Sequence, residues 1–167
     1  PKGLSILGDY VKLEPLDSNK HSKQLFKANM EPGGDEIWDY LPYGPFDTEQ
    51  VYHQWLNKIQ SETDPYFFTI IRISDQRAVG VASYLRISPE DGTIEVGHIN
   101  FSPTLQRTTE ATEAMFLMMR WAFEAGYRRY EWKCNALNLK SRKAAQRLGL
   151  SYEGFFRQAT MSKGRNR

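Results

Sequence analysis

The sequence has little of what marks a secreted or membrane-bound protein. It contains one cysteine, Cys134, so no disulfide can form within the chain and a reducing compartment suits it best. No apolar run approaches the roughly twenty residues that a membrane span needs. The first part of the chain is polar and interrupted by Gly3, Gly8 and Pro15, unlike a secretory signal. We therefore expect a cytoplasmic protein without a membrane partner.

The motifs of several enzyme classes are also missing. His21, His53 and His98 lack the spacing of metal ligands, so no metal site is expected. The sequence contains no Gly-x-Gly-x-x-Gly, no Walker lysine motif and no Gly-x-Ser-x-Gly, which argues against dinucleotide, P-loop and hydrolase sites. A net charge of +2 is too small to predict a nucleic-acid partner, and the basic residues 163–167 are interpreted as a solvated terminus rather than a phosphate-binding arm.

The composition is that of a single globular domain. The chain has 167 residues, of which 40% are hydrophobic and 25% charged, enough for one domain with a substantial core. Apolar runs and turn signals predict strands over residues 10–14, 66–73, 78–86, 93–101, 129–134 and 151–157. Helical periodicity and capping residues predict helices over residues 18–29, from 47 onward, 109–125 and 138–149. This order predicts an α/β (α+β) fold with a mixed, mostly antiparallel sheet.

The start of the second helix is predicted from a pair of capping residues. Asp47 is followed three residues later by Gln50, as in a capping box, so we expect the helix to begin at Asp47. Val51, Trp55 and Ile59 then recur at four-residue spacing and would give this helix one apolar face.

The strand predicted over residues 93–101 changes its pattern half-way. Ile94 and Val96 place apolar side chains on even positions, whereas Ile99 and Phe101 place them on odd positions. A β-bulge at Gly97 would explain the change, because one extra residue moves every later side chain to the other face. The alternative is a strand that is buried on both faces and needs no bulge.

The turn after this strand is a candidate phosphate site. It leads from Phe101 into the helix that begins near Thr109, and the N-terminus of a helix presents unpaired N–H groups and a partial positive charge. Arg107 adds a formal charge at the same place. The alternative is a helix that Thr108 or Thr109 simply caps.

Short blocks in a fixed order carry a resemblance to a known family. The blocks are Glu95-Val96-Gly97-His98-Ile99, Gln106-x-x-Thr109-x-Ala111-Thr112-Glu113-Ala114, Asn138-x-x-Ser141 and Leu148-Gly149-Leu150-x-x-Glu153-Gly154. Together they resemble the GNAT superfamily, and specifically its ribosomal-protein N-acetyltransferase (RimJ/RimL-like) branch. The resemblance spans about residues 10–160. Each block is common by itself, and the ordered set is specific.

The resemblance implies one GNAT domain over residues 1–167 that uses acetyl-CoA. In this family the bulged strand splays from its neighbour, and the pantetheine of acetyl-CoA pairs with the strand backbone in the gap. A following turn holds the pyrophosphate, although here Thr109 replaces the family's glycine and Glu110 adds an opposing charge. The residues implied for acetyl-CoA are Ile99, Asn100, Phe101, Gln106, Arg107, Thr108, Thr109, Ala111, Asn138 and Lys143. The family's final strand should follow a turn near residues 164–166, so the domain is expected to lack that strand.

The implied activity is transfer of an acetyl group to a primary amine by direct attack in a ternary complex. Glu95 is the expected general base, since a carboxylate beside a bulge can be partly desolvated; the alternative is a surface carboxylate. Many family members protonate the leaving sulfur with a tyrosine at the position of Ala145, whereas the RimJ/RimL-like branch uses a serine at the position of Ser141. Asn138 and Ser141 could equally form an ordinary helix cap.

The acceptor amine is expected to be a protein N-terminal α-amine or a small molecule. Trp38, Tyr40, Tyr43 and Phe46 lie in a segment predicted as a loop over residues 31–46, which in this family borders the acceptor cleft; they could also be core residues. The expected partners are this small-molecule or peptide amine and, in a homodimer, a second copy of the chain. Two other functions remain open: a non-catalytic acyl-CoA-binding module, and an RNA- or ribosome-associated protein.

Overall fold

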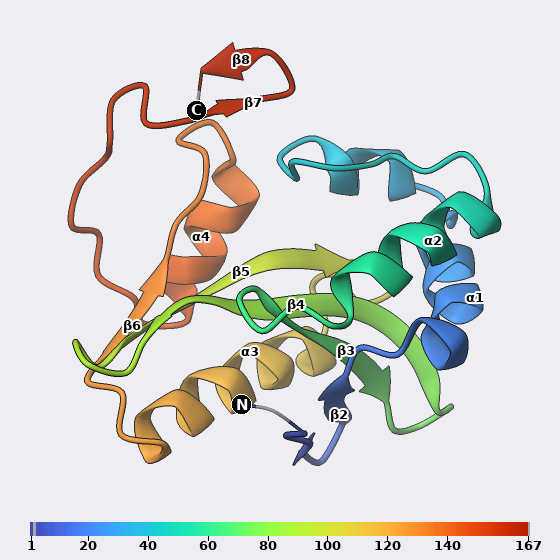
Figure 1. Ribbon diagram of the computed structural model, residues 1–167, viewed down its shortest axis with the longest axis horizontal. Helices are drawn as coiled ribbons and strands as arrows, with labels where there is room; N and C mark the ends of the chain where they lie inside the picture. Colours follow the sequence, from blue (N-terminus) through green and yellow to red (C-terminus); the bar gives the residue numbers. More distant parts are fainter. Residues whose placement is uncertain (2, 167) are drawn as a thin grey trace.

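The computed structural model describes residue 1 and residues 3–166 (Figure 1). In chain order the elements are β1 (Ile6–Leu7), β2 (Val11–Pro15), α1 (Ser18–Asn29), the 3-10 helix η1 (Gly34–Trp38), α2 (Glu49–Ile59), β3 (Tyr66–Arg72), β4 (Arg77–Ser88), β5 (Thr93–Phe101), α3 (Thr109–Glu124), β6 (Arg129–Trp132), α4 (Leu139–Arg147), β7 (Met161–Ser162) and β8 (Arg165–Asn166). No helix in this part of the chain combines the length and the apolar character needed to cross a bilayer.

Strands β1 to β6 form one six-stranded sheet in that spatial order. Neighbouring strands are antiparallel from β1 to β5, and β5 and β6 are parallel and are joined by a crossover through α3. Strands β7 and β8 form a separate hairpin. The predicted α/β fold with a mixed, mostly antiparallel sheet is therefore confirmed.

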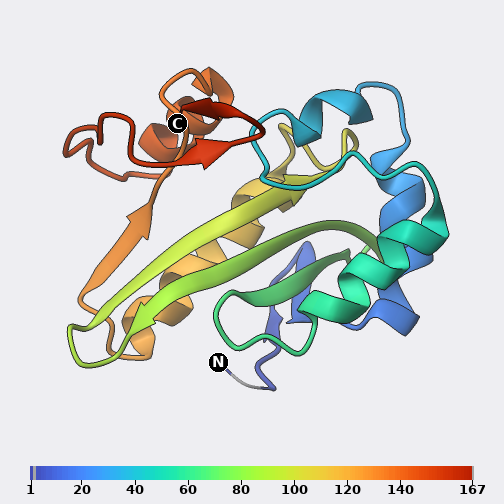
Figure 2. The same ribbon diagram turned by 45° about the horizontal axis from the view of Figure 1, so that its top comes forward.

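Helices cover both faces of the sheet (Figures 1 and 2). Helix α3 packs on one face through a stripe with small and flexible side chains: Ala111, Ala114, Met115, Leu117, Met118 and Ala122. Helices α1 and α2 and the helix η1 cover the other face, where Leu25, Leu56 and Trp38 join a second apolar cluster. Every α4 residue is at least partly exposed, and this helix lies beyond β6.

The predicted bulge in β5 is confirmed. Ser83 of β4 pairs with Gly97, and Val81, two residues earlier, pairs with Asn100, so β5 holds one extra residue between these pairs. His98 takes up this residue with a φ of 49°, in the left-handed region. Side chains before the bulge and after it consequently alternate in opposite phase, as the sequence pattern indicated.

The predicted start of α2 is wrong. Thr48, rather than Asp47, is the N-cap, and its Oγ1 accepts a hydrogen bond from the N–H of Val51 at 3.3 Å. The buried stripe is Tyr52, Leu56 and Ile59, whereas Val51 is 48% exposed. A helical stripe needs mixed spacings of three and four residues, so the four-residue series Val51, Trp55 and Ile59 begins outside the buried stripe and joins it only at Ile59.

Two segments differ from the predicted secondary structure. Residues 31–46 are not loop throughout, because η1 forms within them around the buried Trp38. Residues 151–157 form no strand and are fully exposed. A strand needs a ladder partner for its backbone groups, and no described residue supplies one to this segment.

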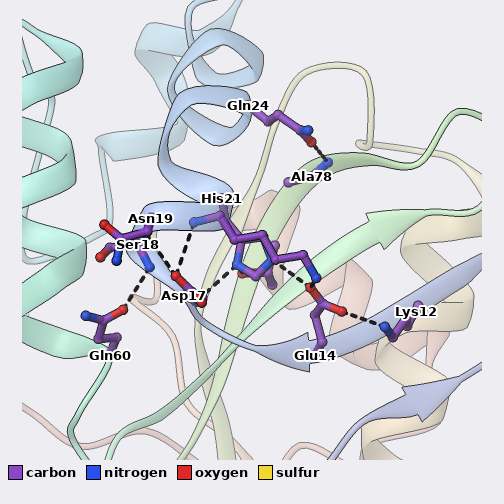
Figure 3. A network of polar contacts seen from close by, with 11 residues as sticks. Lys12, Glu14, Asp17, Ser18, Asn19, His21, Gln24, Gln60 and Ala78 are labelled. Atoms are coloured by element: carbon purple, nitrogen blue, oxygen red, sulfur yellow. Dashed lines mark hydrogen bonds and ion pairs between the residues drawn. The ribbon is translucent and has the colours of Figure 1, made fainter.

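A polar network under α1 links that helix to β2 and β3 (Figure 3). Glu14 is buried and accepts from Lys12 at 2.6 Å, from His21 Nε2 at 2.7 Å and from Lys20. The other ring nitrogen, His21 Nδ1, accepts from the N–H of Asp17 at 3.1 Å and lies 3.0 Å from the hydroxyl of Thr69. His21 is therefore a neutral ring with its proton on Nε2.

This network makes the fold sensitive to acid. Burial by itself would raise the pKa of Glu14, but the hydrogen bonds from Lys12, Lys20 and His21 lower it to about 2 from 4.5. Ionised Glu14 thus stabilises the fold fully above pH 4.5, and this contribution is lost as the pH falls towards 2. Burial also lowers the pKa of His21 below 6.5, although Glu14 opposes it, so protonation of the unfolded chain adds to the loss of stability below that pH.

The substitution Glu14→Gln tests this network. We expect it to lower the free energy of unfolding at pH 7 by roughly 2–3 kcal/mol, since the charged acceptor for two lysines is removed. Urea unfolding at pH 7 and pH 3 should show a smaller pH dependence for the variant than for the unaltered chain. Glu62→Gln, at an exposed carboxylate, is the matched control and should change neither value. An unchanged pH dependence in Glu14→Gln would show that other groups cause the acid sensitivity.

Candidate active site

The candidate site is the place where β5 and β6 part. Their parallel pairing runs from Thr93–Arg129 to Val96–Trp132 and stops there, directly before the bulge. From Gly97 to Phe101, β5 pairs only with β4 among the described strands. One edge of this backbone is consequently open to a ligand, and the predicted residues Ile99, Asn100 and Phe101 lie on it.

Gly97 leaves little space for a side chain at the point of divergence. A Cβ atom on Gly97 would lie 2.8 Å from the side chain of Leu85 and 3.9 Å from Glu95 Oε1. A larger residue at this position would therefore force the Leu85 side chain to move, and the Glu95 carboxylate lies within contact distance of the same point.

The turn between β5 and α3 has the geometry of a capped helix start. Thr108 is the N-cap, with its Oγ1 accepting from the N–H of Ala111 at 3.1 Å and donating to Leu105 O at 2.6 Å. Gln106 ties this turn to the end of β5, because its side-chain amide donates to Phe101 O at 3.0 Å. Arg107 is exposed and has a φ of 63°. The predicted residues thus form one turn, and of the two predicted caps the structure selects Thr108.

Thr109 and Glu113, both in the motif on α3, differ in their surroundings. Thr109 stands where the family has glycine, and it is exposed, so its side chain does not fill the turn. Glu113 accepts hydrogen bonds from the backbone N–H groups of Asp9, Tyr10 and Val11 at 2.7–2.8 Å. Glu113 therefore fastens α3 to the turn between β1 and β2 and takes no part in the site.

Glu95 is buried and paired with two cations. Its side chain is 4% exposed, with Oε1 2.7 Å from Arg86 and Oε2 2.7 Å from Lys133. Burial opposes the charge on Lys133, but hydrogen bonds to Glu131 and Glu95 raise its pKa. The interpretation of Glu95 as a solvated surface carboxylate is wrong, since the fold buries it and pairs it with Arg86 and Lys133.

Nothing in the sequence indicates that Arg86 and Lys133 pair with Glu95. Arg86 comes directly after Leu85, which pairs with Glu95, and the register between β4 and β5 shifts between Leu85 and Ser88. Within this second irregularity of β4, Arg86 has a φ of 48°. Asp64 fixes this irregularity by accepting from the N–H groups of Arg86 and Ile87 at 2.8 and 3.0 Å. The isolated aspartate before Pro65 gave no signal of this role, because its partners lie more than twenty residues away.

Ser141 lies in the first turn of α4. Its N–H donates to the Asn138 side chain at 3.0 Å, so Asn138 is the helix cap that the sequence allowed. Its hydroxyl oxygen lies 2.9 Å from the indole nitrogen of Trp132. Of the neighbouring basic residues, Lys140 pairs with Glu36 at 2.7 Å, and Lys143 is exposed on the helix.

The aromatic segment before α2 packs against the bulge. The ring of Tyr43 lies 4.3 Å from that of Trp55 and is stacked on His98 at 5.6 Å, with an interplanar angle of 10°. Burial raises the pKa of Tyr43 above its usual range. Trp38 and Phe46 join the same cluster, with their rings 5.4 Å apart. For Trp38 the interpretation as a core residue is correct, since it is 6% exposed.

Tyr40 differs from the other aromatic residues of this segment. Its hydroxyl donates to Leu137 O at 3.2 Å, and this bond links the end of η1 to the loop before α4. Lys163 in the β7–β8 hairpin makes a similar link by donating to Trp38 O at 2.8 Å. These two contacts link the aromatic segment to the loop before α4 and to the β7–β8 hairpin. Among residues 1 and 3–166, no group of His, Cys, Asp and Glu could hold a metal ion.

Comparison with known proteins agrees with this geometry. The chain matches the Acetyltransferase (GNAT) domain over residues 11–151, which is most of its length. The chain belongs to the GNAT family. The bulged β5, its divergence from β6 and the helix that starts after it are thus the features of a GNAT domain, and membership supports an N-acetyltransferase activity.

Individual proteins similar to this GNAT domain are named as acetyltransferases. The crystal structure of a GCN5-related N-acetyltransferase from Brucella melitensis is 40% identical, with a TM-score of 0.97 over 100% of this chain and 76% of that chain. A GNAT-family acetyltransferase from Chromobacterium violaceum is 42% identical, with a TM-score of 0.90 over 99% and 83%. An uncharacterised N-acetyltransferase of Bacillus subtilis, YnaD, is 27% identical over 73% of this chain and 70% of its own.

Proposed function

We propose that this GNAT domain transfers an acetyl group from acetyl-CoA to a primary amine, either a protein N-terminal α-amine or a small-molecule amine. The observation that carries the proposal is the open backbone edge of β5 beyond the bulge, where pairing with β6 has ended at Val96 and Trp132. The Asn138-x-x-Ser141 spacing supports a place in the RimJ/RimL-like branch.

The residues around the gap suit acetyl-CoA. The amides and carbonyls of residues 99–101 can pair with the amide groups of pantetheine, which form the same bonds as a strand. The turn of residues 106–111 offers the first N–H groups of α3 to the pyrophosphate, and the exposed Arg107 offers charge. Lys143 is accessible for the 3′-phosphate, and the exposed Thr109 leaves the turn open.

The chain's own groups would then supply proton transfer and polarisation. Acetyl-CoA brings an activated thioester carbonyl. Glu95 accepts the proton of the attacking amine, directly or through water, and N–H groups of residues 99–101 stabilise the negative charge on the carbonyl oxygen. The Ser141 hydroxyl donates a proton to the leaving sulfur. Water returns a proton to Ser141 and removes one from Glu95, so the chain ends each turnover unchanged.

The acceptor would lie over the aromatic segment. The Tyr43 hydroxyl lies 3.2 Å from His98 Nδ1 in the bulge of β5, and the Tyr40 hydroxyl donates to Leu137 O in the loop before α4, so the segment joins both sides of the proposed site. Such a surface suits a peptide or an amine with an apolar body.

Binding of acetyl-CoA is the first test. At a concentration one hundred times its Kd, acetyl-CoA should add about 2.7 kcal/mol to the free energy of unfolding and raise the melting temperature. NAD, which carries a similar pyrophosphate without pantetheine, is the control ligand and should give no shift. The absence of a shift at millimolar acetyl-CoA would contradict the proposal.

Turnover separates an enzyme from a binding module. Release of CoA thiol is measured with a panel of small amines and of peptides with free N-termini, and we expect at least one to be acetylated. The two ion pairs of Glu95 give a specific reason to test for the alternative, because they could hold the carboxylate away from an amine. Binding of acetyl-CoA without release of CoA thiol by any amine would favour a non-catalytic acyl-CoA-binding module.

A further inference from the structure

The tryptophan at the end of β6 contacts the proposed acid. Trp132 is the last residue of β6 and pairs with Val96 at the final position before the two strands part. Its ring is half-buried beside the core under α3, and its indole nitrogen lies 2.9 Å from Ser141 Oγ. No motif in the sequence indicates a role for this residue.

The chemistry of the two groups fixes the direction of this hydrogen bond. An indole N–H can only donate, so Ser141 Oγ must be the acceptor. The N–H of Ser141 is already bonded to Asn138, which holds the first turn of α4 in place. Since the indole is not an acceptor, the hydroxyl proton of Ser141 is free to point to an acceptor other than Trp132. The hydroxyl oxygen itself is held in place by the indole N–H.

The same bond would assist the transfer of that proton. When Ser141 gives its proton to the sulfur, negative charge develops on Oγ. A donor that already points at this atom stabilises the charge without reorganisation. Because Trp132 stands where β5 and β6 diverge, it also sets where α4 presents the hydroxyl relative to the gap.

We propose that Trp132 is a positioning residue for acetyl transfer, which orients Ser141 Oγ–H towards the leaving sulfur and stabilises the oxygen once the proton has left. The inference rests on the proposed function of the site, and it adds a residue that acts through Ser141 rather than on the substrate.

The test compares Trp132→Phe, Ser141→Ala and the double variant, using the amine that the unaltered chain acetylates best. Phenylalanine keeps a smaller apolar ring and cannot donate the hydrogen bond, and a Trp121→Phe control accounts for the lost ring volume. We expect Trp132→Phe to lower kcat about tenfold, with the KM for acetyl-CoA changed less than twofold, and Ser141→Ala to lower kcat about a hundredfold. The double variant should match Ser141→Ala, because an indole has nothing to orient once the hydroxyl is gone.

Trp121→Phe is the matched control. Trp121 is also partly buried against the core under α3, with its ring 5.2 Å from Tyr84, and it lies on α3 away from Ser141. Its replacement should leave kcat within twofold. A loss equal to that of Trp132→Phe would show that ring packing, rather than the indole N–H, causes the effect.

A spectroscopic measurement is independent of turnover. The ¹H–¹⁵N resonance of the Trp132 indole, assigned from the Trp132→Phe spectrum, should shift in Ser141→Ala and remain in place in Trp121→Phe. The proposal would be overturned if the indole resonance did not move in Ser141→Ala. It would also be overturned if the fold-loss of kcat in the double variant equalled the product of the fold-losses in the two single variants. If the unaltered chain acetylates an amine while Ser141→Ala keeps full kcat, the roles of Ser141 and Trp132 both fail but the proposed function stands. If the unaltered chain acetylates no amine, the proposed function itself fails.

Discussion

Replacing Glu95 by glutamine is expected to lower kcat at pH 7 by about two to four orders of magnitude, the range typical of a general base. Glutamine has the same shape and cannot accept the amine proton. The loss should shrink as the pH rises, because an acceptor amine with a pKa of about 7.7–8.0, or about 10.4 for a lysine, then arrives already neutral. The measurement is kcat between pH 6 and pH 10, with acetyl-CoA saturating.

The ion pairs of Glu95 define the control for this experiment. Glu131 is the second carboxylate on Lys133, it is only partly buried, and we give it no part in proton transfer. Glu131→Gln therefore removes one partner of Lys133 while leaving the proposed base intact, and kcat should stay within a few-fold. A loss in Glu95→Gln that does not depend on pH, together with a lower melting temperature, would mean that Glu95 serves only to hold Arg86 and Lys133.

Replacing Gly34 by alanine is expected to lower the free energy of unfolding by about 3 kcal/mol, a large value for one methyl group. A Cβ atom at this position would lie 1.8 Å from Asn29 O at the end of α1, so η1 would have to move. Because η1 carries Trp38, the acceptor KM should rise as well, whereas the Kd for acetyl-CoA should change little. Urea unfolding and the two ligand constants measure these effects.

The neighbouring glycine provides a matched control. Gly33 has a φ of 89°, but a Cβ atom there would meet nothing within 4 Å. Gly33→Ala thus adds only the strain of a left-handed backbone, about 1–2 kcal/mol, and should leave the acceptor KM unchanged. Equal losses of stability in the two variants would show that backbone strain, rather than the clash with Asn29, limits this turn.

The sequence predicted those features that depend on local periodicity. The change of phase between Val96 and Ile99 predicted the bulge, since only an extra residue reverses the two faces of a strand. The helix predicted over residues 109–125 follows an equally local periodicity, and the structure confirms it as α3 (Thr109–Glu124). The resemblance to a family added the open gap between β5 and β6, which no single segment encodes.

The remaining features depend on contacts between distant segments. Arg86, Lys133 and Trp132 hold the two proposed catalytic side chains, yet none of them has a local pattern that shows this before the sheet brings it into place. The strand predicted over residues 151–157 is absent because a strand also depends on a partner from a distant segment. Its apolar residues favour a strand, but no described segment pairs with it.

The end of β6 has a further consequence for kinetics. Trp132 contacts Ser141, and the next residue, Lys133, contacts Glu95, so the proposed acid and base are supported from two adjacent Cα positions. A substitution that displaces this short stretch of backbone would disturb both proton transfers together. Solvent isotope effects on the two steps should therefore change in concert for variants at residues 132–134, and separately for variants in β4 or α4.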